Sequence, residues 1–371
     1  MSKEPSRQTM RAMVLTGHGG PEKLVYRTDH PKPAAGADEV LVRVRASGLN
    51  NTDINTRTAW YSKSVRGATS EALDADTSDT TGDWGGSGLN FPRIQGGDVC
   101  GIVESVGANA DNALIGRRVL LDPCLRDLDD PDNFDKAGYL GSERDGGFGE
   151  YVALHHAYVH PIESSLSDAE LATFPIAYVT AENMLERAQV TADDVVLVTG
   201  ASGGVGSALI QLAKRRGARV VAQCSASKHD AIAPLGADAL LGRDVNDLAA
   251  ALQTAIGRPT VTVVADVVGG AAWQQLINVL SRRGRYTCAG AIAGAVVEFD
   301  LRVFYLHDLT FTGATISPAG MFARLVKYIE RGEVRPLLAA TYPLEQLHEA
   351  QAAFVSKKHV GNIVVTVSND E

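Results

Sequence analysis

The chain has 371 residues, of which 45% are hydrophobic and 21% are charged, and its net charge at pH 7 is −9. This composition is typical of a globular protein with room for two domains. The negative charge disfavours nucleic acid and anionic membranes as partners, because both would repel the chain. No run of about 20 apolar residues predicts a membrane span, and residues 1–11 lack the apolar core of a signal peptide. We therefore expect a cytoplasmic protein.

The first part of the chain predicts an antiparallel β domain. Short apolar segments alternate there with turns that contain glycine and proline. Residues 47–61 form a polar stretch that contains three asparagines, which suggests either a site or an ordinary turn. Residues 62–91 form an insertion rich in Asp, Thr, Ser and Gly. It is expected to be either a lid or rim of a pocket or a plain surface loop, and Trp84 is the residue expected to hold it against the protein.

A glycine-rich segment at 195–217 predicts a strand, a tight turn and a helix. The glycines in the turn are Gly200, Gly203, Gly204 and Gly206. Glycine lets the backbone approach a pyrophosphate closely, and the positive end of the following helix faces the phosphates. A basic run at 214–216 complements the negative end of this helix, and Gly217 can adopt the left-handed cap. The pattern predicts a dinucleotide site.

The next strand, expected at 219–224, indicates which dinucleotide binds. In NAD-binding proteins an acidic residue about 20 residues after the turn contacts the ribose hydroxyls. Here the strand ends in Gln223, Cys224 and Ser225, with Lys228 following and Arg243 further on, so no acidic side chain at the end of the strand would repel a 2′-phosphate. The sequence therefore favours NADP(H). Alternatively, Ser225 only caps a helix and Lys228 only carries a surface charge, and both interpretations can hold together.

Alternating strand and helix patterns continue after this point and predict a parallel, doubly wound sheet. The expected strands are 261–268, 285–290 and 309–313, and the expected helices are 273–280 and 321–332. A last strand at 361–367 is expected to rejoin the first domain. The predicted domains are a catalytic domain at 1–165 that carries the insertion 62–91, a nucleotide-binding domain at 166–314, and a C-terminal return at 315–371.

Five motifs taken together resemble the medium-chain dehydrogenase/reductase superfamily. They are GLNNTD at 48–53, GGDVCG at 96–101, DGGFGEYV at 145–152, TGASGGVG at 199–206 and HVGNIV at 359–364. The resemblance implies an α/β protein with a GroES-like β domain and a Rossmann domain built on a doubly wound parallel sheet. It also implies a homodimer joined at the edge strand near 309–313.

The chain departs from the zinc-dependent members of this superfamily. Zinc-dependent alcohol dehydrogenases place their catalytic ligands where this chain has Asn50, Gly97 and Ile176, and Asp98 alone cannot hold Zn²⁺ in a tetrahedral site. The loop at 124–143 has the length of the structural-zinc loop but only one cysteine. We therefore expect no metal. The resemblance then points to the zinc-free branch of quinone oxidoreductases and 2-enoyl reductases, which use NADPH.

This branch implies a particular chemistry. Hydride addition to a conjugated C=C bond or a quinone delocalises the negative charge, which hydrogen-bond donors and a proton source can stabilise without a Lewis acid. We expect an NADPH-dependent oxidoreductase whose partner is a small molecule with a conjugated carbonyl or a quinone. The alternatives are an alcohol dehydrogenase or carbonyl reductase of the zinc type, and a non-catalytic NADPH-binding protein of the zeta-crystallin kind.

The resemblance also assigns roles to individual residues. Similarity to mitochondrial-type enoyl reductases makes Tyr61 the proton donor and lets Asn50 position the carbonyl or the nicotinamide. Alternatively, Tyr61 only stacks in the pocket and water supplies the proton. Asp53 is expected to brace the backbone, and His359 to lie at the surface or at the domain seam. The expected cofactor-binding residues are Thr180 at the nicotinamide; Gly203, Gly204, Val205 and Gly206 at the pyrophosphate; Ser225, Lys228 and Arg243 at the 2′-phosphate; Gly269, Ala291 and Ile292 at the ribose and nicotinamide; and Asn362 at a position often occupied by lysine or asparagine.

Overall fold

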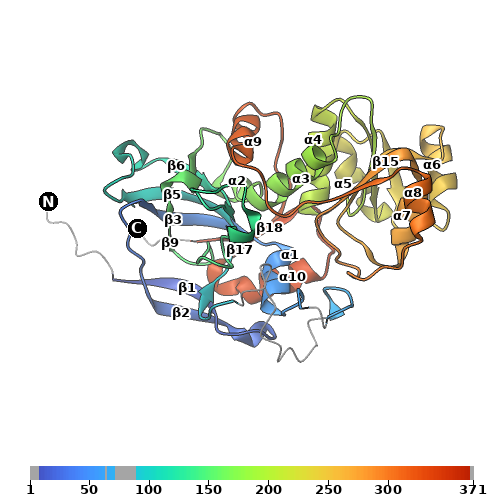
Figure 1. Cartoon of the computed structure of the whole chain (residues 1–371). Coiled ribbons are helices and arrows are strands. Elements are labelled where there is room, and N and C mark those ends of the chain that lie inside the picture. The colour runs from blue at the N-terminus through green and yellow to red at the C-terminus, as the bar shows by residue number, and fades with distance from the viewer. Residues whose placement is uncertain (1–7, 63–64, 72–88, 368–371) are drawn as a thin grey trace.

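The computed structural model describes residues 8–62, 65–71 and 89–367. A β-rich unit and an α/β unit lie side by side, and the C-terminal segment returns from the second to the first (Figure 1). Trp84 and most of the insertion lie outside the described residues, so the expectation for them stays a prediction. Among the helices that the structure describes, none is both long and apolar enough to cross a bilayer.

The β-rich unit is built around a seven-stranded sheet. Its path is β10-β6-β5-β3-β18-β17, and β9 also pairs with β3. A second sheet has the order β2-β1-β4, and β7 pairs with β8. The elements are β1 (Thr9–Leu15), β2 (Leu24–Pro31), β3 (Glu39–Gly48), α1 (Asn51–Arg57), β4 (Arg93–Ile94), β5 (Asp98–Val106), β6 (Arg118–Leu121), β7 (Cys124–Leu125), β8 (Gly138–Tyr139), β9 (Tyr151–His155), β10 (Val159–Pro161) and α2 (Asp168–Leu171).

The α/β unit has a parallel sheet with the order β13-β12-β11-β14-β15-β16. The predicted doubly wound parallel sheet is therefore confirmed. This order reverses direction between β11 and β14, and ligands bind at such a switch point in open α/β sheets. The elements are α3 (Pro175–Arg187), β11 (Val195–Val198), α4 (Gly204–Arg215), β12 (Arg219–Cys224), α5 (His229–Ile232), β13 (Ala239–Gly242), α6 (Leu248–Ile256), β14 (Val261–Asp266), α7 (Trp273–Asn278), β15 (Leu280–Cys288), α8 (Leu301–Leu306) and β16 (Thr310–Gly313).

Both faces of the parallel sheet are covered by helices. Val196 and Val198 of β11 belong to the core on the side of α3 and α4. Leu197, which points to the opposite face because side chains alternate along a strand, belongs to the core with α6 and α7. A strand that is buried on both faces needs a continuous apolar run, which explains the sequence VVLV.

The helix after β11 begins and ends as predicted. Its N-cap is Gly203, and Gly217 adopts the left-handed conformation with φ +83° just beyond its C-terminus. A side chain at Gly206 would place its Cβ 2.2 Å from the carbonyl oxygen of Gly200, so only glycine fits there. The expected boundary near 280 was wrong, because α7 ends at Asn278 and β15 begins at Leu280. Arg283, at φ +62°, lies in a register shift that lets this longer strand pair with β14.

The C-terminal segment joins the two units. It contains α9 (Met321–Glu330), β17 (Leu338–Pro343), α10 (Leu347–Val355) and β18 (Asn362–Thr366). β18 pairs antiparallel with β3 of the first unit, which confirms that the last strand rejoins that domain. Just before β18, the N–H of Gly361 donates a 2.8 Å hydrogen bond to the carbonyl oxygen of Ser202 in the glycine turn. The same segment therefore contacts both units.

The lobe at 124–143 is attached to the rest of the molecule by a buried arginine. Arg126 pairs with Asp122 at 2.5 Å and donates to the carbonyl oxygen of Ser317 at 3.0 Å. The hydroxyl of Tyr158 donates to the carbonyl oxygen of Arg126. These bonds tie the lobe to β10 and to the segment before α9, so the lobe has a polar anchor that uses no cysteine.

Gly361 supplies a test of this framework. It has φ +86°, and a Cβ there would lie 2.0 Å from the carbonyl oxygen of Leu337. We expect Gly361→Ala to lower the free energy of unfolding by about 2 kcal/mol, measured by urea denaturation. Gly17→Ala is the matched control, because a Cβ there meets no atom within 4 Å. Equal stability of the two variants would contradict this account.

Candidate active site

A cavity of about 850 Å³ lies between the two units at the carboxyl ends of β11, β12, β14 and β15. Its volume is in the range of small-molecule and cofactor sites. Most of the predicted site residues line it, namely Asn50, Tyr61, Thr180, Gly203, Gly204, Val205, Gly206, Ser225, Lys228, Arg243, Gly269, Ala291 and Ile292. Residues from loops far apart in the sequence are thus brought to one cavity.

Asn362 is placed differently. Its side chain is 3% exposed and lies against the glycine turn, where a Cβ at Gly204 would lie 2.3 Å from Asn362 Oδ1. Asn362 is not among the residues that line the cavity. The structure therefore places it beside the start of α4, and its expected role at the cofactor stays a prediction.

The part of the cavity that the glycine turn lines rests on a buried carboxylate. Asp266, at the end of β14, accepts hydrogen bonds from the hydroxyls of Thr199 at 2.5 Å and Tyr286 at 2.7 Å. It also accepts the backbone N–H groups of Val268 and Gly269. Three neighbouring strand ends are thereby held together beneath the glycine turn. Asp266 was not predicted as a site residue, because an acidic residue at a strand end carries no local signal for these partners.

The end of the cavity that was expected to bind a 2′-phosphate carries two cations. The Nζ of Lys228 donates to the carbonyl oxygens of Lys357 at 2.6 Å and His359 at 2.7 Å, so it ties β12's loop to the C-terminal segment. Arg243 is exposed and pairs with Asp244 at 3.0 Å. This acidic neighbour was not considered in the sequence analysis. Lys228 and Arg243 thus share the cavity wall, although each already has a partner.

Asn50 lies at the opposite end of the cavity and is held by two buried carboxyl groups. Its backbone N–H donates to Asp53 Oδ2 at 2.7 Å, which is the bracing role expected for Asp53. Its side-chain Nδ2 donates to Asp98 Oδ2 at 2.7 Å. The other oxygen of Asp98 accepts the N–H of Ile176 at 2.5 Å. Burial raises the pKa of both Asp53 and Asp98 to about 7.

The three positions of catalytic zinc ligands in zinc-dependent dehydrogenases can now be compared with the geometry. Asn50 donates to Asp98, Gly97 has no side chain, and Ile176 fills the space beside it, since a Cβ at Gly97 would lie 2.7 Å from Ile176 Cδ1. One carboxylate and one amide do not make the donor set that Zn²⁺ requires. In the described part of the chain, one group of potential ligands lies close enough to share an ion, namely Asp38, His155 and His156, and it lies outside the cavity.

Tyr61 lies in the cavity beside other aromatic residues. Its hydroxyl accepts a long, 3.5 Å hydrogen bond from Asn55 Nδ2, and its ring packs edge-on against Trp60. Burial raises the pKa of Tyr61 well above its usual value, so the hydroxyl stays protonated and can donate a hydrogen bond. Tyr139 lines the same cavity and was missed, because it comes from the 124–143 lobe and no motif marked it.

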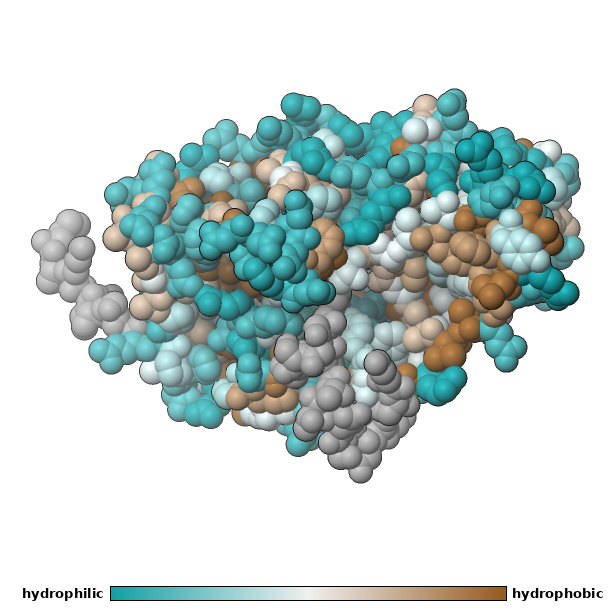
Figure 2. All heavy atoms as spheres, viewed as in Figure 1, coloured by the Kyte–Doolittle hydropathy of each residue, from teal (hydrophilic) through white to brown (hydrophobic). Residues whose placement is uncertain are grey.

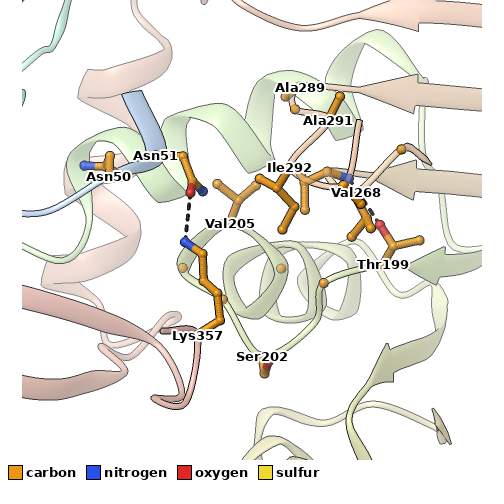
Figure 3. Close-up of a pocket in the computed structure, with 18 of the residues that line it drawn as sticks. Asn50, Asn51, Thr199, Ser202, Val205, Val268, Ala289, Ala291, Ile292 and Lys357 are labelled. Atoms are coloured by element: carbon orange, nitrogen blue, oxygen red, sulfur yellow. Dashed lines mark hydrogen bonds between the residues drawn. The ribbon is translucent and has the colours of Figure 1, made fainter. Parts of the chain in front are cut away.

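Lys357 was also missed, and it crosses the cavity (Figure 3). Its Nζ donates to Asn51 Oδ1 at 2.8 Å. In the sequence it is one of two adjacent lysines after a helix, a pattern typical of a solvated surface, so only the packed structure reveals its place.

The two buried carboxyl groups predict a pH dependence of stability. Their folded pKa values lie above the unfolded value of 3.8, so the folded state binds more protons than the unfolded state between these pH values. This stabilisation is complete below pH 3.8 and is lost as the pH rises through about 7. We expect Asp98→Asn to reduce the loss of unfolding free energy between pH 5 and 8 by about 1–2 kcal/mol, measured by urea denaturation. The exposed Asp230→Asn is the control, and an unchanged slope in Asp98→Asn would refute the assignment.

Two protein families match the chain, Alcohol dehydrogenase GroES-like domain at residues 36–164 and Zinc-binding dehydrogenase at residues 204–331. A crystal structure from Sinorhizobium meliloti 1021, provisionally named an alcohol dehydrogenase, is 45% identical, covers 98% of each chain and has a TM-score of 0.88. Quinone oxidoreductase of Homo sapiens is 26% identical and covers 93% of each chain. Acryloyl-coenzyme A reductase of Metallosphaera sedula is 25% identical over 96% of this chain and 100% of its own length.

The fold, the position of the cavity and these similarities all indicate the same protein family. The GroES-like and parallel-sheet units occupy the matched ranges in the expected order. The chain belongs to the medium-chain dehydrogenase/reductase superfamily, in its quinone and enoyl reductase-like branch, and is an oxidoreductase whose Rossmann domain binds a nicotinamide cofactor.

Proposed function

We propose that this protein is an NADPH-dependent reductase that transfers a hydride to a conjugated C=C bond or a quinone without a catalytic metal ion. The observation that supports it best is the set of contacts around Asn50. The groups at the positions of zinc ligands are an amide and an aliphatic residue, and the carboxylate beside them accepts two hydrogen bonds from these same residues.

The chemistry follows from that donor set. Bound NADPH would supply a hydride for the β-carbon of an enone and leave as NADP⁺, and the π electrons of the enone would then move to its carbonyl oxygen. A proton then adds to the α-carbon. Because the charge is spread over an enolate, neutral hydrogen-bond donors of the protein are sufficient to stabilise it. An isolated ketone would concentrate the charge on one oxygen, for which a Lewis acid is the usual solution.

The residues at this end of the cavity suit defined roles. Tyr61 keeps its proton, so it donates a hydrogen bond to the substrate oxygen, and either Tyr61 or water delivers the proton. Asn50 Nδ2 points to Asp98, which leaves its Oδ1 as the atom that can accept a hydrogen bond from the nicotinamide carboxamide. Thr180 lines the same end. Asn50 is therefore proposed to position the cofactor.

The preference for NADPH is proposed from the opposite end of the cavity. Ser225, Lys228 and Arg243 line the wall after β12, and none of them is acidic. Arg243 is exposed and can leave its weak surface pair with Asp244 to bind a 2′-phosphate. Such a phosphate carries more charge than one carboxylate, so it competes well for the guanidinium.

The proposed function predicts NADPH oxidation with a panel of enones and quinones, followed at the absorbance of the reduced nicotinamide. We expect the rate to be unchanged by a chelator, to be lower with NADH, and to be negligible with simple aliphatic alcohols and NADP⁺. Tyr61→Phe should lower kcat about 100-fold while NADPH affinity is kept.

Tyr342→Phe is the control for loss of a tyrosine hydroxyl, because Tyr342 lies in β17 and does not line the cavity. Stoichiometric zinc with robust alcohol oxidation would instead favour the alcohol dehydrogenase suggested by the name of the Sinorhizobium structure. NADPH binding without turnover of any compound in the panel would favour a non-catalytic role.

We also propose a homodimer that forms across β16, the edge strand of the parallel sheet. Exposed hydrophobic residues gather over the neighbouring α8 (Figure 2), where Leu301 is 66%, Tyr305 59% and Leu306 55% exposed. An unpaired edge strand beside an apolar patch is a surface that a second copy can cover. We expect sedimentation to give a dimer for the native chain and a monomer for Leu301→Asp, with Leu128→Asp, on the 124–143 lobe, as the exposed control. A monomeric native chain would refute this.

A further inference from the structure

Lys357 has an unusual position in the cavity wall. It follows α10 and adopts a left-handed backbone conformation with φ +52°, which is disfavoured for residues with a Cβ. The side chain lines the cavity and reaches across it to Asn51 (Figure 3).

The ammonium group of Lys357 has no acidic partner among the described residues. It donates to the amide oxygen of Asn51 at 2.8 Å and lies 3.7 Å from the centre of the Phe354 ring. Another cation, Lys228, donates to the backbone carbonyl of Lys357 itself, and its charge acts on the Lys357 ammonium group. Two cations therefore lie together in a cavity wall, an arrangement that a bound anion would stabilise.

The neighbouring backbone indicates where such an anion would bind. Gly361, four residues after Lys357, forms a β-bridge with Gly203 of the glycine turn and donates to the carbonyl oxygen of Ser202 at 2.8 Å. Lys357 is thus close in the chain to the point where the C-terminal segment meets the N-terminus of α4, a 12-residue helix. The positive end of this helix is the expected place for a pyrophosphate.

We propose that Lys357 binds the pyrophosphate of the nicotinamide cofactor, with Asn51 orienting its ammonium group and Lys228 holding its backbone. This inference rests on the proposed use of a dinucleotide cofactor. Arg243, in contrast, lies at the part of the wall proposed to bind the 2′-phosphate. Lys357 and Arg243 are therefore proposed to bind different groups of the cofactor. Binding of NADPH and NADH can separate the two roles, because both cofactors contain a pyrophosphate and only NADPH contains a 2′-phosphate.

The proposal has a pH signature. Removal from water inside the cavity and the nearby charge of Lys228 lower the pKa of Lys357 to about 8. Lys357 therefore loses its charge as the pH rises through 8, and cofactor affinity should fall several-fold between pH 7 and 9.5. His359, the other titratable group beside it, has a pKa lowered to about 4 by burial and stays neutral over this range. Lys228 also has a lowered pKa, so an arginine variant is needed to isolate Lys357.

The test is cofactor binding by calorimetry, without substrate, for NADPH and NADH. We expect Lys357→Gln to weaken both cofactors by about tenfold and by the same factor. Arg243→Gln should weaken only NADPH. Lys358→Gln, the adjacent exposed lysine, should bind like the native chain. Lys357→Arg should keep affinity at pH 7 and remove most of the loss at pH 9.5. Thermal unfolding of each variant confirms that it is folded.

Other results would overturn the assignment. Native affinity of Lys357→Gln for both cofactors, or a loss restricted to NADPH, would show that Lys357 does not bind the pyrophosphate. A native chain that binds neither cofactor would refute the proposed function and this inference together. A native chain that binds both cofactors but reduces no enone or quinone would count against the proposed function only, and the comparison of variants would still decide the role of Lys357.

Discussion

The structure depends on the contact between the C-terminal segment and the glycine turn. Gly361 donates to Ser202, and the strand that follows it pairs with β3, which ends just before Asn50. The glycine turn and the end of the cavity at Asn50 are therefore linked through a few residues of backbone. Hydride transfer requires the donor and acceptor carbons to be held close together and correctly oriented. A backbone link of this kind fixes the distance between the two ends of the cavity without relying on flexible side chains.

Two buried acidic residues complete the framework. Asp266 gathers the ends of three parallel strands under the glycine turn, and Asp98 connects Asn50 of one unit with the backbone of α3 at Ile176. Burying a carboxyl group is costly unless hydrogen bonds compensate for lost water. Each of these residues accepts several such bonds, so each specifies one arrangement of the segments around it. Neither needs to contact substrate to shape the site.

The charge distribution of the cavity differs from that of the whole chain. The protein has a net charge of −9, yet Lys228, Arg243 and Lys357 all line the cavity. A local positive region in an acidic protein attracts an anionic cofactor while the remaining surface repels other polyanions. At the other end the lining is neutral, with Asn50, Tyr61 and Thr180. This gradient suits the proposed arrangement, in which the charged part of a dinucleotide and a neutral, conjugated acceptor bind at opposite ends of one cavity.

The sequence by itself determined the elements whose signals are local. The aliphatic run at 195–198, the glycines after it and the cap at Gly217 each act on neighbouring residues, so the strand, turn and helix follow directly from their order. The alternation of further strands and helices then predicts the parallel sheet. The boundary near residue 280 could not be predicted, because a register shift against another strand decides it.

The tertiary structure alone decided the partners of individual side chains. Lys357 and Asn51 are 306 residues apart, and Asn50 and Asp98 are 48 apart. Nothing in either sequence neighbourhood indicates these pairs, because they depend on how β18 and β5 pack beside β3. For the same reason Asn362 lies against Gly204 and is not part of the cavity lining, and Tyr139 reaches the cavity from a lobe without a motif. Local patterns encode periodicity and turn geometry, whereas the chemistry of the site depends on contacts that exist only after packing.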